Sequence, residues 1–203
     1  MIVWRPSSPL RCAAGADVIG REESGVCVWL TGLSASGKTT TALALIDVLQ
    51  ARACETVLLD GDQVRKAWFP TLGYSSADRE VNVRHIGELA RDAVERGLVA
   101  VCAVISPFIA GRDACRALVG ADRFVEVYVS TPLAECERRD PKGLYARARR
   151  GDITQVCGID VPYEAPRSPD LVLDTVTATV GHNVERILQC LQQRHLLALD
   201  ARR

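Results

Sequence analysis

Short apolar runs alternate with longer amphipathic segments along most of the chain. The apolar runs, each the length of a β-strand, are residues 26–31, 56–60, 98–105, 124–129 and 171–174. The segments with helical periodicity are residues 38–52, 78–96, 111–119, 132–139 and 179–196. Such alternation is typical of parallel strands joined by right-handed helical crossovers. The pattern therefore predicts an α/β fold in which a five-stranded parallel sheet carries helices on both faces.

The first 24 residues do not follow this alternation. They include Pro6 and Pro9 and show no sustained periodicity, which predicts an N-terminal arm at residues 1–24. Residues 25–203 are then expected to form one domain, because a chain of 203 residues with 48% hydrophobic side chains can bury one core.

Charge and cysteine usage narrow the choice of partners and compartment. Lysine plus arginine and aspartate plus glutamate each number 25, so no excess charge indicates nucleic acid or an anionic membrane. The eight cysteines form no C-x-x-C pair, which argues against a zinc site. Cys27 and Cys102 lie in apolar runs, as buried thiols do in a reducing compartment. The early apolar run at 2–4 is too short for a signal peptide, so we expect a cytoplasmic protein.

Residues 32–39 carry a complete phosphate-binding motif, G-x-x-x-x-G-K-S/T, between an apolar run and a helix-forming run. Gly32 and Gly37 permit a tight turn that aims backbone N–H groups at phosphate oxygens. Lys38 should reach the β- and γ-phosphates while the Thr39 hydroxyl binds Mg²⁺. The predicted ATP-binding residues are Gly32, Leu33, Ser34, Ala35, Ser36, Gly37, Lys38, Thr39 and Thr40. The motif in this setting predicts a P-loop NTPase fold with ATP and Mg²⁺ as cofactors.

Two carboxylates and an arginine follow the second predicted strand, at Asp60, Asp62 and Arg65. If the strand geometry persists, Asp60 and Asp62 lie on one side of an extended segment. One could hold the hydration shell of Mg²⁺ and the other could accept the proton of an acceptor hydroxyl. The alternative is an Asp-Gly turn with a capping aspartate. The nearby phosphate-binding loop favours the functional interpretation.

The helix predicted at 78–96 opens with several polar side chains. It should start at Ser76 or Asp78, both of which cap helices well. Arg79, Asn82 and Arg84 could project towards the mouth of the site, where guanidinium groups suit a phosphorylated substrate. Taken alone, the run is more typical of a solvated helix face with salt bridges.

Ser106 ends the third predicted strand, directly before Pro107. In an open parallel sheet, ligands bind beyond the carboxyl ends of the strands. The Ser106 hydroxyl could therefore bind substrate, although a simple strand-end turn would use the same residues.

A basic segment covers residues 138–150. It contains six basic residues against the single acid Asp140. A flexible segment of this charge suits a lid that closes on phosphates and expels water. An RNA-binding patch is the rival interpretation, but Tyr145 is the segment's one aromatic residue.

Several blocks of sequence together resemble the adenylylsulfate (APS) kinase family of P-loop kinases. Among them are Leu-Asp-Gly-Asp-Gln-Val-Arg at 59–65 and Asp-Pro-Lys-Gly-Leu-Tyr at 140–145. The full set is residues 32–40, 59–65, 72–75, 78–84, 105–108, 140–145 and 158–166. The resemblance implies transfer of the γ-phosphoryl group of ATP to the 3′-hydroxyl of adenosine 5′-phosphosulfate (APS), in sulfate assimilation. The product would be 3′-phosphoadenosine 5′-phosphosulfate, and the family also implies a homodimer.

By position, the resemblance assigns roles to individual residues. The catalytic residues would be Lys38, Asp62 and Ser106, with Asp62 as the base. The substrate-binding residues would be Asp62, Arg65, Tyr74, Arg79, Asn82, Ile105, Ser106, Lys142 and Leu144. The metal ligands would be Thr39 and Asp60, and a lid would cover about residues 138–165. A phosphoserine at the position of Ser106 has been proposed in the family, but a loose transition state favours direct in-line transfer.

The chain departs from the family at two places. Val156 stands where the family has a phenylalanine that stacks on the substrate adenine, whereas Tyr74 keeps a ring at the second stacking position. Losing one stacking surface could cost about 1 to 3 kcal/mol. Residues 66–69 are also unusual for the family, and Trp68 or Phe69 could supply a substitute contact.

Three functions remain open from the sequence. The first is an APS kinase with an altered adenine clamp. The second is a kinase of the same fold for another nucleotide-like alcohol, such as a cytidine diphosphate derivative. The third is a catalytically silent nucleotide-binding regulator. The complete set of charged residues at the acceptor site argues against the third.

Overall fold

The computed structural model describes residues 25–197, so the predicted arm at 1–24 lies outside the described residues. One sheet contains the strands β1 (Val26–Thr31), β2 (Thr56–Asp60), β3 (Val99–Ala103), β4 (Phe124–Val129) and β5 (Leu171–Leu173). All pairings are parallel, and the order across the sheet is β2-β3-β1-β4-β5. The prediction of an α/β fold with a five-stranded parallel sheet is confirmed.

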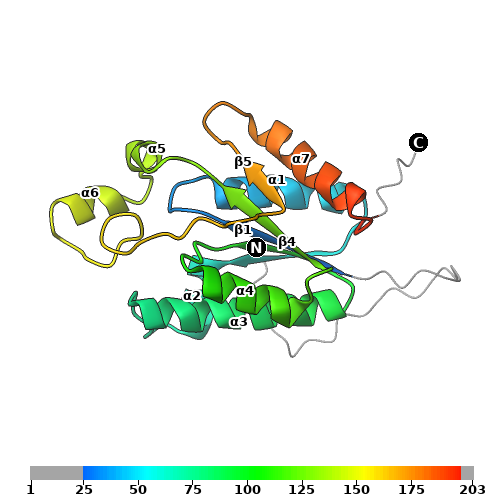
Figure 1. Ribbon diagram of the computed structural model, residues 1–203, viewed down its shortest axis with the longest axis horizontal. Coiled ribbons are helices and arrows are strands. Elements are labelled where there is room, and N and C mark those ends of the chain that lie inside the picture. The colour runs from blue at the N-terminus through cyan, green and yellow to red at the C-terminus, as the bar shows by residue number, and fades with distance from the viewer. Residues whose placement is uncertain (1–24, 198–203) are drawn as a thin grey trace, which may run out of the picture.

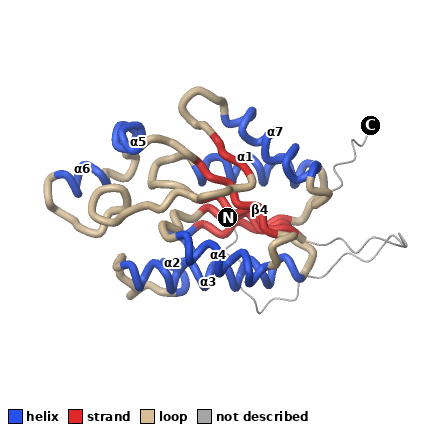
Figure 2. The backbone as a smooth tube through the Cα atoms, in the orientation of Figure 1, coloured by secondary structure: helices blue, strands red, loops and turns tan. Residues whose placement is uncertain are grey.

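Helices cover both faces of the sheet. They are α1 (Lys38–Ala51), α2 (Gly61–Trp68), α3 (Ser76–Glu95), α4 (Ile109–Val119), α5 (Leu133–Arg139), α6 (Leu144–Arg149) and α7 (Val180–Gln193). Helices α1 and α7 lie on one face, and α2, α3 and α4 lie on the other, with the strands as a layer between them (Figures 1 and 2). Each of the five helices predicted from periodicity is present. Their ends differ from the prediction by at most three residues, the largest difference being the end of α7 at 193 instead of 196.

The sheet separates two buried cores. Every residue of β1 is buried, because β1 is the central strand. Val28 and Leu30 pack in the core that includes α1 and α7, whereas Cys27 and Trp29 pack in the core that includes α3 and α4. Successive side chains of a strand point to opposite faces, so a strand buried on both faces has a continuous apolar sequence. Among the described residues, no helix is long and apolar enough to cross a membrane.

The segment after β2 is helical, so the prediction that Asp60 and Asp62 share one side of an extended segment is wrong. Helix α2 begins at Gly61, and Asp60 is its N-cap. The Asp60 carboxylate accepts hydrogen bonds from the backbone N–H groups of Asp62 at 3.0 Å and Gln63 at 3.2 Å. The capping alternative is therefore correct, and it still leaves the other Asp60 oxygen facing the phosphate-binding loop.

The start of α3 also differs slightly from the prediction. Its N-cap is Ser75, one residue before Ser76, and Asp78 is the other member of a capping box. The Ser75 hydroxyl accepts from Asp78 N at 3.2 Å, and the Asp78 carboxylate accepts from Ser75 N at 3.2 Å. Two N–H groups that the helix itself cannot bond are thus satisfied.

Helix α6 and the loop after it extend beyond the carboxyl edge of the sheet (Figure 1). The N-cap of α6 is Gly143, and the Asp140 carboxylate accepts from the N–H groups of Leu144 at 2.7 Å and Ala146 at 2.9 Å in its first turn. A third apolar cluster, centred on Tyr145 and Val156, packs against Leu33 of the phosphate-binding loop. Residues 138–165, hereafter the lid segment, are therefore joined to that loop by packing.

Candidate active site

The phosphate-binding loop connects the end of β1 to the first turn of α1. Its backbone takes positive φ at Gly32 (148°), Ala35 (59°) and Gly37 (101°). A Cβ atom at Gly32 would lie 2.6 Å from the backbone oxygen of Val129, so only glycine fits there. The loop thus has the tight turn that the motif predicts, with the N-terminus of a 14-residue helix directly behind it.

Side chains from distant segments hold this loop in place. The hydroxyl groups of Thr131 and Thr175 donate to the backbone oxygen of Ser36 at 2.8 and 2.9 Å. Arg139 of α5 donates to the Thr175 hydroxyl at 3.0 Å, and Tyr145 of the lid segment donates to the backbone oxygen of Ser34 at 3.1 Å. The motif gives no sign of these contacts, since they depend on which strand ends become neighbours.

Lys38 is buried beneath the loop. Its ammonium group donates to the backbone oxygens of Gly32 at 2.9 Å and Leu33 at 2.6 Å. Burial lowers the pKa of Lys38 from 10.5 to about 8, against the raising influence of Cys136, Asp62 and Asp60. The ammonium group therefore sits where added negative charge, such as a phosphate, would stabilise it strongly.

Thr39 and Asp60, the predicted metal ligands, lie next to each other. The Thr39 hydroxyl donates to Asp60 Oδ2 at 2.9 Å. Among residues 25–197, no three His, Cys, Asp or Glu side chains gather as a metal cluster. A hydroxyl and one carboxylate nevertheless fit Mg²⁺, which takes oxygen ligands and usually keeps waters and substrate phosphates in its shell.

A cavity of about 550 Å³ opens beside the loop, at the carboxyl ends of β2 and β3. Its wall includes every predicted substrate-binding residue, namely Asp62, Arg65, Tyr74, Arg79, Asn82, Ile105, Ser106, Lys142 and Leu144. The volume is within the range of small-molecule sites. The structure thus brings together, from four separate segments, the residues that the sequence analysis grouped.

Asp62 and Lys142 form an ion pair across this cavity. Burial alone would raise the pKa of Asp62, but the hydrogen bond and charge of Lys142, with the charges of Lys38 and Lys66, lower it overall. The same hydrogen bond raises the pKa of Lys142. Asp62 is therefore held as a carboxylate, the form that can accept a proton.

Tyr74 presents its ring to the cavity and is 54% exposed. The guanidinium carbons of Arg65 and Arg79 lie 4.8 and 5.7 Å from the centre of this ring. Arg79 also donates to the backbone oxygens of Tyr74 at 3.0 Å and Gln155 at 2.6 Å, so it links α3 to the lid segment. The buried Oδ1 of Asn82 has no hydrogen-bond partner among the described residues. Two cations, a ring and a free acceptor form a wall suited to an anionic nucleotide.

Val156 also lines the cavity and is 3% exposed. The hypothesis that Trp68 or Phe69 replaces the missing ring is wrong. Both rings instead pack on His85, at centroid distances of 5.1 and 5.0 Å, and neither lines the cavity. They turn away because α2 continues as a helix to Trp68.

Arg84 does not reach the site either. Its side chain is 83% exposed and pairs with Glu88 at 3.4 Å along the outer face of α3. The alternative of a solvated salt-bridged face is therefore correct at Arg84, whereas Arg79 and Asn82 lie on the inner face, one helical turn apart.

Most of the basic residues at 138–150 are paired with nearby acids. Arg138 and Arg139 contact Glu135 at 2.7 Å, Arg149 contacts Glu137 at 2.6 Å, and Arg150 contacts Asp152 at 2.8 Å. Arg147 lines the cavity and has no carboxylate partner within residues 25–197. Lys142, which also lines the cavity, is paired with Asp62, so Arg147 is the basic residue of this segment that brings uncompensated positive charge to the cavity. Arg147 belongs to the basic segment recognised in the sequence but not to the predicted site residues.

Comparison with known proteins agrees with this geometry. The family model described as adenylylsulphate kinase matches residues 24–174. The chain belongs to the adenylylsulphate kinase family. The resemblance stated from the sequence is confirmed, and so is the prediction of a P-loop kinase.

Solved members of the APS kinase family share the fold. CysC, the APS kinase of Mycobacterium tuberculosis, solved in complex with AMPPNP and APS, is 39% identical; the match covers 83% of this chain and 98% of that chain, with a TM-score of 0.80. The structure of APE1195 is also 39% identical, with 84% and 97% coverage and a TM-score of 0.77. A hexameric APS kinase from Thiobacillus denitrificans is 34% identical; the match covers 87% of this chain but 30% of that one, with a TM-score of 0.66.

Proposed function

We propose that this kinase transfers the γ-phosphoryl group of ATP to the 3′-hydroxyl of APS and so produces 3′-phosphoadenosine 5′-phosphosulfate. The observation that carries the proposal is the cavity itself, in which the family's acceptor-binding positions meet beside the phosphate-binding loop. Support also comes from the M. tuberculosis enzyme, a relative of similar length that was solved with AMPPNP and APS.

Four side chains divide the chemistry. Asp62, held ionised by Lys142, accepts the proton of the acceptor hydroxyl as its oxygen attacks. Lys38 neutralises charge on the transferring group inside a site that excludes water. Thr39 and Asp60 would hold Mg²⁺, which supplies charge neutralisation between the phosphates when it is bound.

Ser106 acts through its position and does not carry the phosphoryl group. Its hydroxyl accepts from Trp29 Nε1 at 3.1 Å and donates to Thr31 Oγ1 at 2.9 Å, and the residue is 2% exposed. A phosphoserine there would break both bonds and bury a dianion. Direct in-line transfer needs no such step.

The acceptor is held between the Tyr74 ring and the lid segment. Arg65, Arg79 and the unpaired Arg147 would bind its phosphosulfate, since guanidinium groups suit such anions. Val156 supplies an aliphatic surface where the family has an aromatic ring, so this clamp stacks the adenine on one side.

Residues 138–165 are proposed to open and close as the lid, because they include α6, which extends beyond the carboxyl edge of the sheet, and carry Lys142 and Arg147 to the cavity. We further propose a homodimer in the cytoplasm, as the family resemblance implies. The T. denitrificans relative shows that at least one related chain assembles, although that chain is much longer.

An acceptor screen tests the function. The protein, ATP and Mg²⁺ are incubated with APS or with a cytidine diphosphate derivative, and product is measured by mass. APS should be the preferred acceptor, and Asp62→Asn should reduce kcat by about 100-fold or more while ATP affinity stays within about 2-fold. Preference for the cytidine compound would show that the acceptor is not APS. ATP binding without any phosphoryl transfer would indicate a silent regulator.

A further inference from the structure

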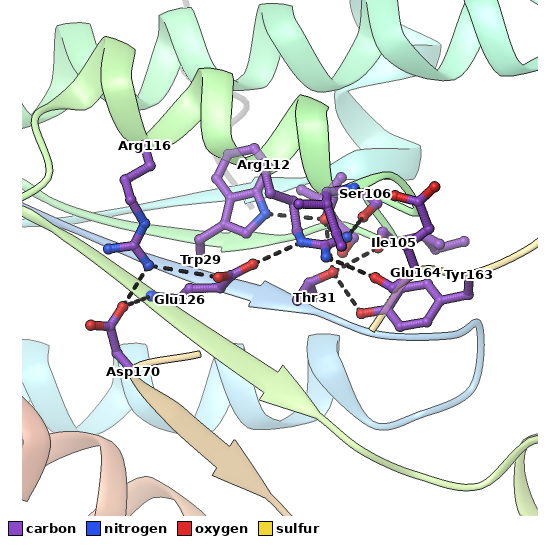
Figure 3. Close-up of polar contacts among 12 residues, drawn as sticks. Trp29, Thr31, Ile105, Ser106, Arg112, Arg116, Glu126, Tyr163, Glu164 and Asp170 are labelled. Atoms are coloured by element: carbon purple, nitrogen blue, oxygen red, sulfur yellow. Dashed lines mark hydrogen bonds and ion pairs between the residues drawn. The ribbon is translucent and has the colours of Figure 1, made fainter. Parts of the chain in front are cut away.

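A buried polar network lies directly behind the cavity wall (Figure 3). At its centre is Arg112 of α4, which is 2% exposed and is not part of the cavity lining. Its Nε donates to Glu126 Oε1 at 2.7 Å, its Nη1 to the backbone oxygen of Ser106 at 2.6 Å, and its Nη2 to the backbone oxygen of Glu164 at 2.7 Å. One planar group therefore joins β4, the segment after β3 and the end of the lid segment.

The backbone at Ser106 is strained. Its φ of 39° is unusual for a residue with a side chain, and such conformations persist only where surrounding contacts fix them. Here Arg112 binds its carbonyl, while Trp29 and Thr31 bind its hydroxyl. Thr31 also donates to the backbone oxygen of Ile105 at 2.8 Å. The residues that face the acceptor are thus fixed from behind.

The same network fixes the root of the lid segment. The Tyr163 hydroxyl lies 3.0 Å from Thr31 Oγ1. Glu164 N donates to the backbone oxygen of Pro107 at 2.8 Å, and Glu164 Oε2 accepts from Ile109 N at 2.7 Å. The wall and the lid root therefore share one support, and Arg112 contacts both parts of it.

Arg116, one turn further along α4, offers a natural comparison. It also pairs with Glu126, at 3.6 Å, and with Asp170 at 2.8 Å, but it is 25% exposed. Figure 3 shows it on the far side of Glu126 from Ser106 and Glu164. Arg116 thus shares helix, charge and carboxylate partner with Arg112 but makes no contact with the wall.

We propose that Arg112 is a positioning residue for acceptor binding: by holding the Ser106 and Glu164 carbonyls together, it sets the spacing between the cavity wall and the lid root. It touches neither substrate. Lysine cannot replace it, because one ammonium group cannot match the three directions of a planar guanidinium fork. The proposal rests on the proposed function only for the identity of the acceptor.

The test compares Arg112→Lys with Arg116→Lys in the full chain. Arg112→Lys should raise KM for APS by about 10-fold or more, with the Kd for ATP within about 2-fold of wild type by calorimetry. Amide hydrogen exchange should become faster in residues 104–109 and 161–166. Arg116→Lys should leave KM, Kd and exchange in both segments close to wild type.

A normal KM for APS in folded Arg112→Lys would overturn the proposal, and so would equal losses of APS and ATP binding. If Arg112→Lys does not fold, Arg112→Met combined with Glu126→Gln removes both buried charges, and the same measurements decide. Failure of that double variant to fold would also overturn it, because Arg112 would then serve the fold as a whole. If the wild type does not phosphorylate APS, the proposed function fails, whereas hydrogen exchange in the two segments still decides the positioning role.

Discussion

The lowered pKa of Lys38 predicts that ATP binding is coupled to proton uptake. Its ammonium group is buried, and its pKa is about 8 in the nucleotide-free protein. About half of the molecules are then neutral at Lys38 at pH 8, and about nine-tenths are neutral at pH 9. Bound phosphates favour the charged form, so ATP binding must return the missing proton.

The size of the effect follows from this pKa. If ATP binds only the charged form, its Kd should rise roughly 8-fold between pH 7.5 and pH 9, about 1.2 kcal/mol. Calorimetry in buffers of different ionisation enthalpy should show uptake of about 0.5 proton per ATP at pH 8. The pH dependence should vanish in Lys38→Met, which cannot titrate. A wild-type Kd that stays within 2-fold over this range, with no proton uptake, would refute the reasoning.

The same shift affects stability, with a sign that can be checked. Between pH 8 and pH 10.5 the unfolded chain carries a proton on Lys38 that the nucleotide-free folded protein lacks. The unfolding free energy should therefore rise with pH across this window by up to about 3 kcal/mol relative to Lys38→Met. Chemical denaturation at pH 8 and pH 10 measures it, and parallel curves for the two proteins would contradict it.

Three further variants test other parts of the site. Lys142→Met removes the partner that lowers the pKa of Asp62, so the acid limb of kcat/KM should move to higher pH; an unmoved limb would contradict this. Asp60→Asn keeps an oxygen that can cap α2 but removes the negative charge. The Mg²⁺ concentration for half-maximal activity should therefore rise several-fold, while the thermal stability stays similar. An unchanged Mg²⁺ titration would rule out the metal role of Asp60. Val156→Phe should lower KM for APS by about 5- to 150-fold, which corresponds to one added stacking contact. The variant should also lose about 1 to 3 kcal/mol of stability, because Val156 is 3% exposed and a larger side chain overpacks its surroundings. An unchanged KM in the folded variant would count against a one-sided clamp.

The strands and five of the seven described helices were predictable from the sequence, whereas α2 and α6 were not. The apolar run that became β1 is buried on both faces and cannot be mistaken for surface. Helices α2 and α6 have eight and six residues and lie where charged residues and Asp-Gly or Pro-Lys-Gly sequences indicate turns, whereas the seven-residue α5 was predicted. Helix α2 begins at the cap Asp60, and α6 begins after Gly143 with the Asp140 carboxylate bonded to N–H groups of its first turn; in the sequence both places are equally typical of turns.

The site was predictable where it lies at strand ends or in the blocks that resemble the family. Asp62 and Ser106 follow β2 and β3, and parallel strands bring such residues to one edge. Arg147 was missed because α6 is too short to reveal which of its side chains face inward, and Gln155 was missed because it lies outside any helix or strand. Arg112 was missed for another reason: an arginine in an amphipathic helix normally indicates a solvated face, and only its contact with Glu126 of β4 shows that it is buried.

The Trp29 indole gives the wall of the cavity an optical reporter. It is fully buried, and its N–H bonds the Ser106 hydroxyl, so its emission should respond to changes in polarity and hydrogen bonding at the wall. The chain has two other tryptophans: Trp68 is 36% exposed beside His85, and Trp4 lies outside the described residues. Replacing these two with phenylalanine would leave one indole whose fluorescence follows occupation of the acceptor site without any label.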